Sequence, residues 1–89
     1  MLRYHIIFKG RVQGVGFRFT TERLARKFGI AGWVRNNPDG SVEVVAEAVK
    51  ERLELFLAGL RDYFSESISD FSLEEAEPKA EFKGFEIKF

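Results

Sequence analysis

The sequence contains no cysteine and only one histidine. Without cysteine, a disulfide framework, a thiolate metal site and a cysteine nucleophile are all excluded. A single histidine leaves no cluster of histidines and carboxylates with the spacing of metal ligands. No apolar run approaches the roughly 18 residues that a membrane-spanning helix needs. Residues 1–5 lack the apolar segment of a signal peptide. We therefore expect a cytoplasmic protein with no bound metal and no membrane partner.

The chain is also short, and it has little proline. Its 89 residues, with two prolines and no linker-like or repetitive stretch, are enough for one domain and too few for two. A hydrophobic share of 45% beside 31% charged residues is typical of a globular chain rather than a disordered one. We expect a single domain over residues 1–89.

Charge is balanced in total but divided along the chain. Residues 1–37 carry eight basic side chains and one acidic side chain, and residues 38–89 carry six basic and 13 acidic side chains. The amino-terminal part therefore has a net charge of +7, which favours the approach of an anion. Alternatively, the two halves neutralise one another in the fold. The total of zero argues against a nucleic-acid partner, because such domains usually carry a basic excess.

Hydrophobic periodicity predicts a mixed order of strands and helices. Alternation of period two marks strands, and apolar positions at i, i+3, i+4 and i+7 mark amphipathic helices. The predicted strands cover residues 3–9, 30–36, 41–48, 71–76 and 82–89, and the predicted helices cover residues 17–28 and 50–64. Helices that are apolar on one side, together with strands whose apolar and polar residues alternate, predict the α+β class. The order of elements predicts a ferredoxin-like two-layer sandwich (β-α-β-β-α-β). Its antiparallel sheet has four to five strands, with both helices on one face.

The same alternation assigns faces within the strands. In residues 3–9, Tyr4, Ile6 and Phe8 are predicted to face the core, and His5 is predicted to be an exposed, non-catalytic strand residue. In residues 41–48 the positions predicted to face outward are Glu43, Val45 and Glu47.

Residues 10–18, GRVQGVGFR, lie between the first predicted strand and the first predicted helix. Glycines there let successive backbone N–H groups converge on an anion, and the helix amino terminus adds free donors and positive dipole. Arg18, in the first helical turn, offers a guanidinium matched to phosphate oxygens. The P-loop and dinucleotide-binding patterns are both incomplete. The segment predicts a phosphoryl site, and the alternative is a tight connection with an exposed arginine.

Three further segments make the pattern specific. GRVQGVGFR is followed by GWVRN at residues 32–36, by PDGSVE at residues 38–43 and by GFEIKF at residues 84–89. In this order and spacing the chain resembles the acylphosphatase family. The resemblance implies a ferredoxin-like fold and a hydrolase that acts on the carboxyl–phosphate bond of small acyl phosphates without a metal or other cofactor.

The resemblance also implies the site residues. The family's catalytic arginine falls on Arg18 and its catalytic asparagine on Asn36, directly before a second amide, Asn37, which could compete for the same water. The residues expected to bind the phosphoryl group are Gln13, Gly14, Val15, Gly16, Phe17 and Arg18.

Two alternatives remain at this stage. One is a non-enzymatic binding or regulatory domain, because similar domains occur within hydrogenase-maturation carbamoyltransferases. The other is an RNA-binding sheet, which would need exposed aromatic side chains on its two central strands. The chain begins at Met1 and stops at Phe89, near the end of the last predicted strand, which favours a complete, stand-alone enzyme. We expect it to act as a monomer without nucleic acid.

Overall fold

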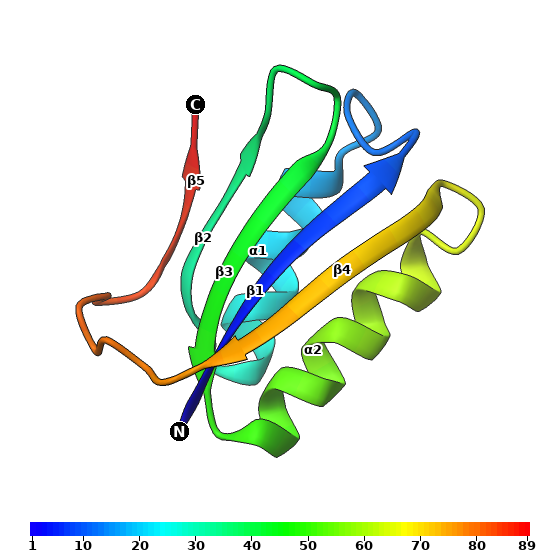
Figure 1. Ribbon diagram of the computed structural model, residues 1–89. Helices are drawn as coiled ribbons and strands as arrows, with labels where there is room; N and C mark the ends of the chain where they lie inside the picture. Colours follow the sequence, from blue (N-terminus) through cyan, green and yellow to red (C-terminus); the bar gives the residue numbers. More distant parts are fainter.

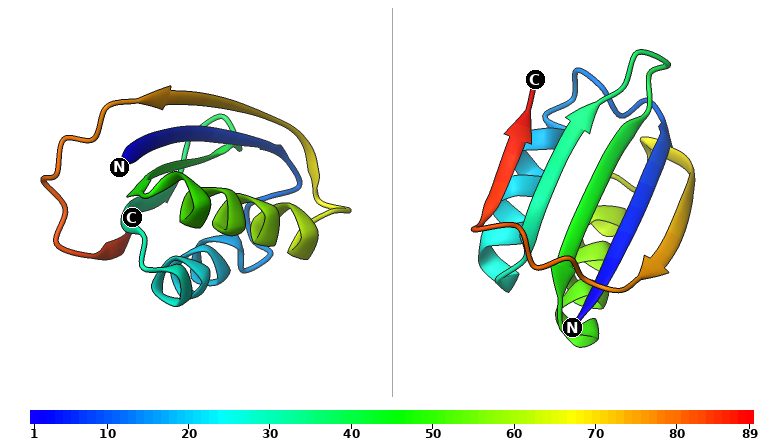
Figure 2. Two further views of the ribbon diagram at one scale, coloured as in Figure 1. Left: turned by 90° about the horizontal axis from the view of Figure 1, so that it is seen from below. Right: turned by 60° about the vertical axis from the view of Figure 1, so that its left-hand side comes forward.

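A computed structural model describes residues 1–89 as a sheet covered on one face by two helices (Figures 1 and 2). The elements in chain order are β1 (Leu2–Gly10), α1 (Phe17–Phe28), β2 (Ala31–Asn36), β3 (Val42–Ala48), α2 (Lys50–Tyr63), β4 (Ile68–Ala76) and β5 (Phe85–Lys88). The five strands form one sheet in the order β4-β1-β3-β2-β5. The predicted two-layer ferredoxin-like class is confirmed.

The sheet differs from the prediction at one edge. β1, β2, β3 and β4 pair antiparallel, but β5 pairs with β2 in parallel, so the expectation of a fully antiparallel sheet is wrong there. The reason is the connection between β4 and β5, which crosses to the opposite edge at the end of the sheet where β4 stops (Figure 1). β5 then runs back in the direction of β2. It begins at Phe85 rather than at residue 82, and β4 begins at Ile68 rather than at residue 71.

Phenylalanine rings join the helices to the sheet. The ring of Phe17, the first residue of α1, lies with its centroid 5.1 Å from that of Phe8 in β1 and 4.6 Å from that of Phe64 beside α2. All three side chains are buried, as are Leu53 and Phe56 on the inner face of α2. Burying a side chain of this size stabilises the fold by about 2–3 kcal/mol. Phe17 therefore fixes the start of α1 beneath the sheet, and with it the end of the preceding loop.

The face of the sheet away from the helices is less exposed than its sequence indicates. Val45 and Glu47 lie on this outer face as predicted, yet both are buried. Val45 pairs with His5 and Trp33, whose side chains flank it. Glu47 is covered by the β4–β5 connection (residues 77–84), which crosses this face (Figure 2). Its carboxylate accepts hydrogen bonds from the backbone amides of Lys79 at 2.8 Å and Ala80 at 3.1 Å.

Candidate active site

The loop between β1 and α1 has the backbone geometry of an anion-binding nest. Gly14 has a φ of 76° and Gly16 a φ of 80°, whereas Val15 between them keeps a negative φ. A Cβ on either glycine would meet open space, so the requirement for glycine comes from the positive φ and not from crowding. Alternating signs of φ turn successive N–H groups toward one side.

The amides of this loop and of the first turn of α1 have no acceptor within the chain. From Gly14 to Phe19, no backbone N–H donates to a backbone carbonyl or a side chain, and the first helical bond runs from Thr20 to the carbonyl of Gly16. No side chain caps the helix at Gly16. Six consecutive donors at the positive end of a helix dipole thus remain free for an anion.

A small cavity opens beside these donors. It has a volume of about 130 Å³ and is lined by Val12, Gly14, Gly16, Phe17, Arg18, Phe19 and Asn36. Both residues predicted to be catalytic therefore line one hollow, together with three other residues predicted to bind phosphate. Gln13 and Val15 do not line it, whereas Val12 and Phe19 line it without having been predicted.

Asn36 reaches the cavity because it is the last residue of β2. Its neighbours in the strand alternate, so Val34 is buried toward the helices and Arg35 projects from the outer face. The Asn36 side chain follows Val34 and faces α1. Its Oδ1 atom is buried and has no hydrogen-bond partner. A buried carbonyl oxygen left unpaired is unfavourable, which makes this atom a candidate to accept a hydrogen bond from a ligand or water.

Arg18 is unpaired with any carboxylate. Its guanidinium lies over the ring of Phe89, with the ζ carbon 4.7 Å from the ring centroid. It makes no salt bridge and its side chain is partly buried. All its N–H groups thus remain available to a bound phosphoryl group, in the bidentate geometry that suits phosphate oxygens.

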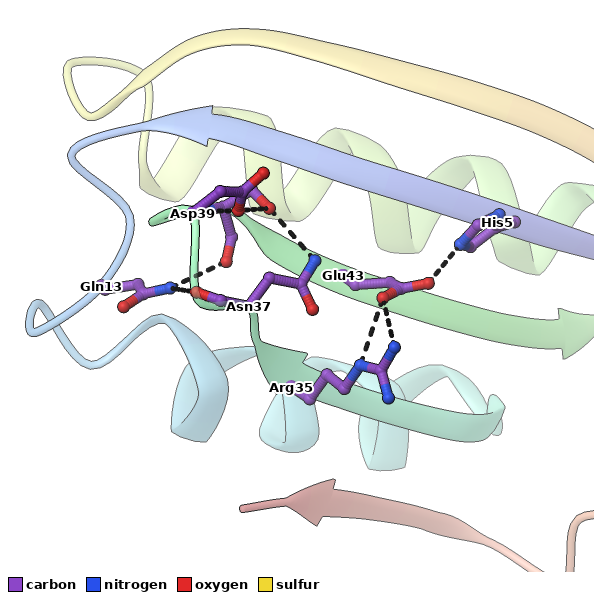
Figure 3. A network of polar contacts seen from close by, with 7 residues as sticks. His5, Gln13, Arg35, Asn37, Asp39 and Glu43 are labelled. Carbon is purple, nitrogen blue, oxygen red and sulfur yellow. Dashed lines mark hydrogen bonds and ion pairs between the residues drawn. The ribbon is translucent and has the colours of Figure 1, made fainter.

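Gln13 has a role that the sequence did not reveal. Its Nε2 atom donates to the carbonyl oxygens of Asn37 at 2.8 Å and Ser41 at 2.9 Å, as Figure 3 shows. These bonds tie the glycine-rich loop to the turn that follows Asn36. The only signal in the sequence is one amide side chain in a glycine-rich loop. Gln13 is predicted to bind the phosphoryl group, but it does not line the cavity, and its side chain instead makes these two contacts with the turn.

The turn itself is held by its own side chains. The Asn37 amide donates to Ser41 Oγ at 3.1 Å, and the Ser41 hydroxyl donates to Asp39 at 2.6 Å. Hydrogen bonds from the side chain and backbone of Ser41 lower the pKa of Asp39 below its ordinary value. Asn37 is thus engaged within the turn and, unlike Asn36, does not line the cavity.

A second polar group lies on the outer face of the same strands. Glu43 Oε2 accepts a hydrogen bond from His5 Nε2 at 2.6 Å, and Glu43 Oε1 accepts two from Arg35, at 2.9 and 3.2 Å (Figure 3). Burial favours the neutral carboxyl, but these hydrogen bonds outweigh it and hold the pKa of Glu43 below its ordinary value. His5 is accordingly half-buried and paired, not simply exposed.

The largest hollow offers a worse anion site. It has a volume of about 580 Å³ and lies between α2 and β4, where the carboxylates of Asp62 and Asp70 line it beside Arg61. No group of three or more His, Cys, Asp or Glu side chains could hold a metal ion. Neither helix is long and apolar enough to cross a membrane. The 130 Å³ cavity combines free amides with an unpaired arginine, and we identify it as the candidate site.

Comparisons with known proteins identify the family of the chain. The acylphosphatase family model matches residues 4–87. An acylphosphatase of Bacillus licheniformis is 43% identical over 91 residues, covering all of both chains. The crystal structure of acylphosphatase from Bacillus subtilis superposes with a TM-score of 0.92 at 39% identity, again over all of both chains.

A larger protein contains a similar segment. The structure of T. kodakarensis HypF matches all of this chain with a TM-score of 0.81 and 31% identity, over 12% of its own length. The alternative of a non-enzymatic binding or regulatory domain rests on such a likeness, but the relatives cited above, matched over their full length, are acylphosphatases. The chain belongs to the acylphosphatase family and is an enzyme that hydrolyses the carboxyl–phosphate bond of small acyl phosphates.

Proposed function

We propose that Arg18 and the free amides from Gly14 to Phe19 bind the phosphoryl group, and that Asn36 orients the attacking water. The observation that carries this proposal is the joint lining of one small cavity by an unpaired guanidinium and a buried, unpartnered amide oxygen. The donors approach from the loop and α1, and Asn36 approaches from the end of β2. A tetrahedral dianion between them would contact both.

These residues suffice for the chemistry of an acyl phosphate. The leaving carboxylate is weakly basic, so its oxygen can depart without a general acid. Phosphoryl transfer depends mainly on positioning and on neutralising charge on the equatorial oxygens. The amides and Arg18 supply that neutralisation in a preorganised form.

Asn36 acts on the nucleophile. Its amide cannot serve as a base near neutral pH, but Oδ1 can accept a hydrogen bond from water and hold it in line with phosphorus. The new bond joins the water oxygen to phosphorus, and the bond from phosphorus to the acyl oxygen breaks with its electron pair leaving on the carboxylate. The proton of the water passes to a phosphate oxygen of the substrate.

The remaining properties follow from the same residues. Charge neutralisation by Arg18 and backbone amides leaves no step that requires a metal, so activity on benzoyl phosphate should persist with a chelator present. A monomer, acting in the cytoplasm without nucleic acid, fits a cysteine-free chain of zero net charge. The outer face of the central strands β1 and β3 carries no aromatic side chain. Light scattering tests the oligomeric state, and cell fractionation tests the cellular compartment.

The experiment compares two adjacent amides. Asn36→Ala should lower kcat for benzoyl phosphate by about a hundredfold or more, because it removes a contact to the nucleophile. KM should change by less than about threefold, since phosphate binding is left intact.

Asn37→Ala is the matched control, because Asn37 lies next in the chain but is bonded within the turn. Its kcat should stay near the native value. Full turnover by the Asn36 variant, or equal losses in both variants, would show that Asn36 does not orient the water.

A further inference from the structure

Exposed apolar side chains gather around the catalytic cavity. Val15, at the tip of the loop, is 39% exposed, Phe19 is 64% exposed and Phe89 is 94% exposed. Phe19 lines the cavity, Val15 stands between two glycines that line it, and the ring of Phe89 stacks on Arg18. We call these three residues the apolar rim. Clustered apolar side chains left in solvent beside a polar site mark a surface that binds something.

The size of the cavity places part of the substrate outside it. A volume of about 130 Å³ is well below the roughly 300 Å³ at which pockets begin to enclose whole small-molecule ligands. With the phosphoryl group bound by Arg18 and the loop amides, the acyl group must extend past the mouth. The side chains that it meets there belong to the apolar rim.

The charged side chains near the rim indicate whether a charged or an uncharged acyl group would bind there. Arg18 is the only charged residue that lines the cavity, and its charge is directed to the phosphoryl group. The nearest acidic side chain along α1, Glu22, pairs with Arg26 at 3.3 Å. Beyond Arg18, the rim presents two aromatic rings and one branched aliphatic side chain. A second carboxylate or ammonium group on the acyl chain would lose water there without gaining a partner from the cavity lining beyond Arg18.

We propose that Val15, Phe19 and Phe89 form an acyl subsite that makes this enzyme prefer acyl phosphates with uncharged, apolar acyl groups. This inference rests on the proposed function, because it takes the phosphoryl group to sit in the cavity. Packing against the rim buries methylene or aryl surface of the substrate on one side. The gain should therefore rise with the length of the acyl chain.

The test uses acetyl, propionyl and butyryl phosphate, whose leaving carboxylates differ little in basicity. For the native enzyme, kcat/KM should rise by about two- to fourfold for each added methylene, the effect expected for partial to full burial of that group. Succinyl phosphate, in which a carboxylate replaces the terminal methyl group of the butyryl chain, should be a poorer substrate than butyryl phosphate. A flat response to chain length, or a preference for succinyl phosphate, would overturn the proposal.

Variants locate the effect. Phe19→Ser should abolish most of the chain-length dependence, and Phe19→Leu should retain part of it because leucine keeps apolar surface. Leu55→Ser, which removes an exposed apolar side chain of α2 that does not line the cavity, should retain the full dependence. If kcat/KM rises equally with acyl chain length in the native enzyme and in Phe19→Ser, the rim does not contact the acyl group.

Inhibition by inorganic phosphate separates this proposal from the assignment of the phosphoryl site. Suppose that phosphate inhibits the native enzyme and Phe19→Ser equally, while the increase of kcat/KM with acyl chain length differs between them. Both proposals then stand. If phosphate inhibition survives Arg18→Ala, the phosphoryl site is misplaced, whatever the chain-length result. If phosphate inhibition depends on Arg18 but chain length has no effect, only the acyl subsite fails.

Discussion

Arg35 and Asn36 are neighbours in β2, yet they belong to two different polar regions of the molecule. Arg35 projects from the outer face, where it donates two hydrogen bonds to Glu43 and lies over the ring of Trp33, 5.0 Å from its centroid. Asn36 faces α1 and leaves a buried oxygen without a partner. In the outer region, named here by His5, Arg35 and Glu43, each charge has a partner. In the site, the donors and the acceptor are unpaired.

The comparison shows how a polar group that is paired within the fold differs from one that is left free for a ligand in this protein. A paired group already makes its hydrogen bonds within the folded protein. It therefore contributes to stability and has few donors or acceptors free for a ligand. An unpaired, preorganised group costs stability and gains its interaction only when a substrate binds. Arg18 and Arg35 are the same residue type, and their surroundings alone distinguish them.

The largest effect should come from removing each arginine in turn. Arg18→Ala should lower kcat/KM for benzoyl phosphate by about a thousandfold or more, with a lower kcat and a higher KM, because in the proposed function the guanidinium binds the phosphoryl group in both substrate and transition state. Arg35→Ala should change kcat/KM by less than about threefold and act on stability instead. Steady-state kinetics with circular dichroism as a folding check measure both. Similar kinetic losses in the two variants would erase the distinction between the regions.

A smaller effect is expected in the outer region. Glu43→Gln should lower the free energy of unfolding by about 2 kcal/mol near neutral pH, because three hydrogen bonds to a charged acceptor are weakened. The pKa of Glu43 lies below its ordinary value of 4.5 in the folded state, so the contribution of the carboxylate is present above that value. It is lost as the pH falls through the folded pKa.

Urea unfolding at several pH values measures this dependence. The difference between the native protein and Glu43→Gln should shrink toward zero in acid. Glu66→Gln, at an exposed position between α2 and β4 and without an ion pair, is the control and should change neither stability nor its pH dependence. A difference that grows in acid would mean that Glu43 is not stabilised as the anion.

The smallest effect concerns the tether between the loop and the turn. Gln13→Met keeps the length of the side chain but removes both donated hydrogen bonds, so the loop amides and Asn36 lose part of their alignment. We expect kcat/KM to fall by about tenfold, mostly through kcat, with a modest loss of stability. Ser41→Ala removes hydroxyl contacts within the same turn but keeps the carbonyl that Gln13 contacts. If the two variants have equal kinetics, Gln13 stabilises the turn without positioning the site.

Much of the fold could be predicted from periodicity. Residues 17–28 form α1 at the predicted bounds, and Gly29 ends it in the left-handed conformation that favours glycine. Tyr4, Ile6 and Phe8 are buried, as the alternation predicted. The parallel pairing of β5 was missed because local alternation carries no information on which edge a strand joins. The burial of Glu47 was missed because residues 77–84, which cover it, are distant in sequence.

The features of the candidate site also fall into two groups: those that local sequence predicts and those that depend on residues distant in the chain. The glycines and Arg18 were marked by a local motif, since a positive φ and a helix start are local properties, whereas Asn36 was indicated only by the family resemblance. The side chain of Gln13 and the pairing of His5 with Glu43 depend on partners 24 to 38 residues away along the chain. No spacing rule within one segment could have found them.

By itself, then, the sequence determined the elements, the faces that they bury, the glycine-shaped loop and the family, because these depend on short-range periodicity and on residues a few positions apart. Only the tertiary structure decided which polar groups are left unpaired. That outcome depends on which strands become neighbours, since β3 brings Glu43 to Arg35 while the end of β2 brings Asn36 to the start of α1, where no side chain meets its oxygen.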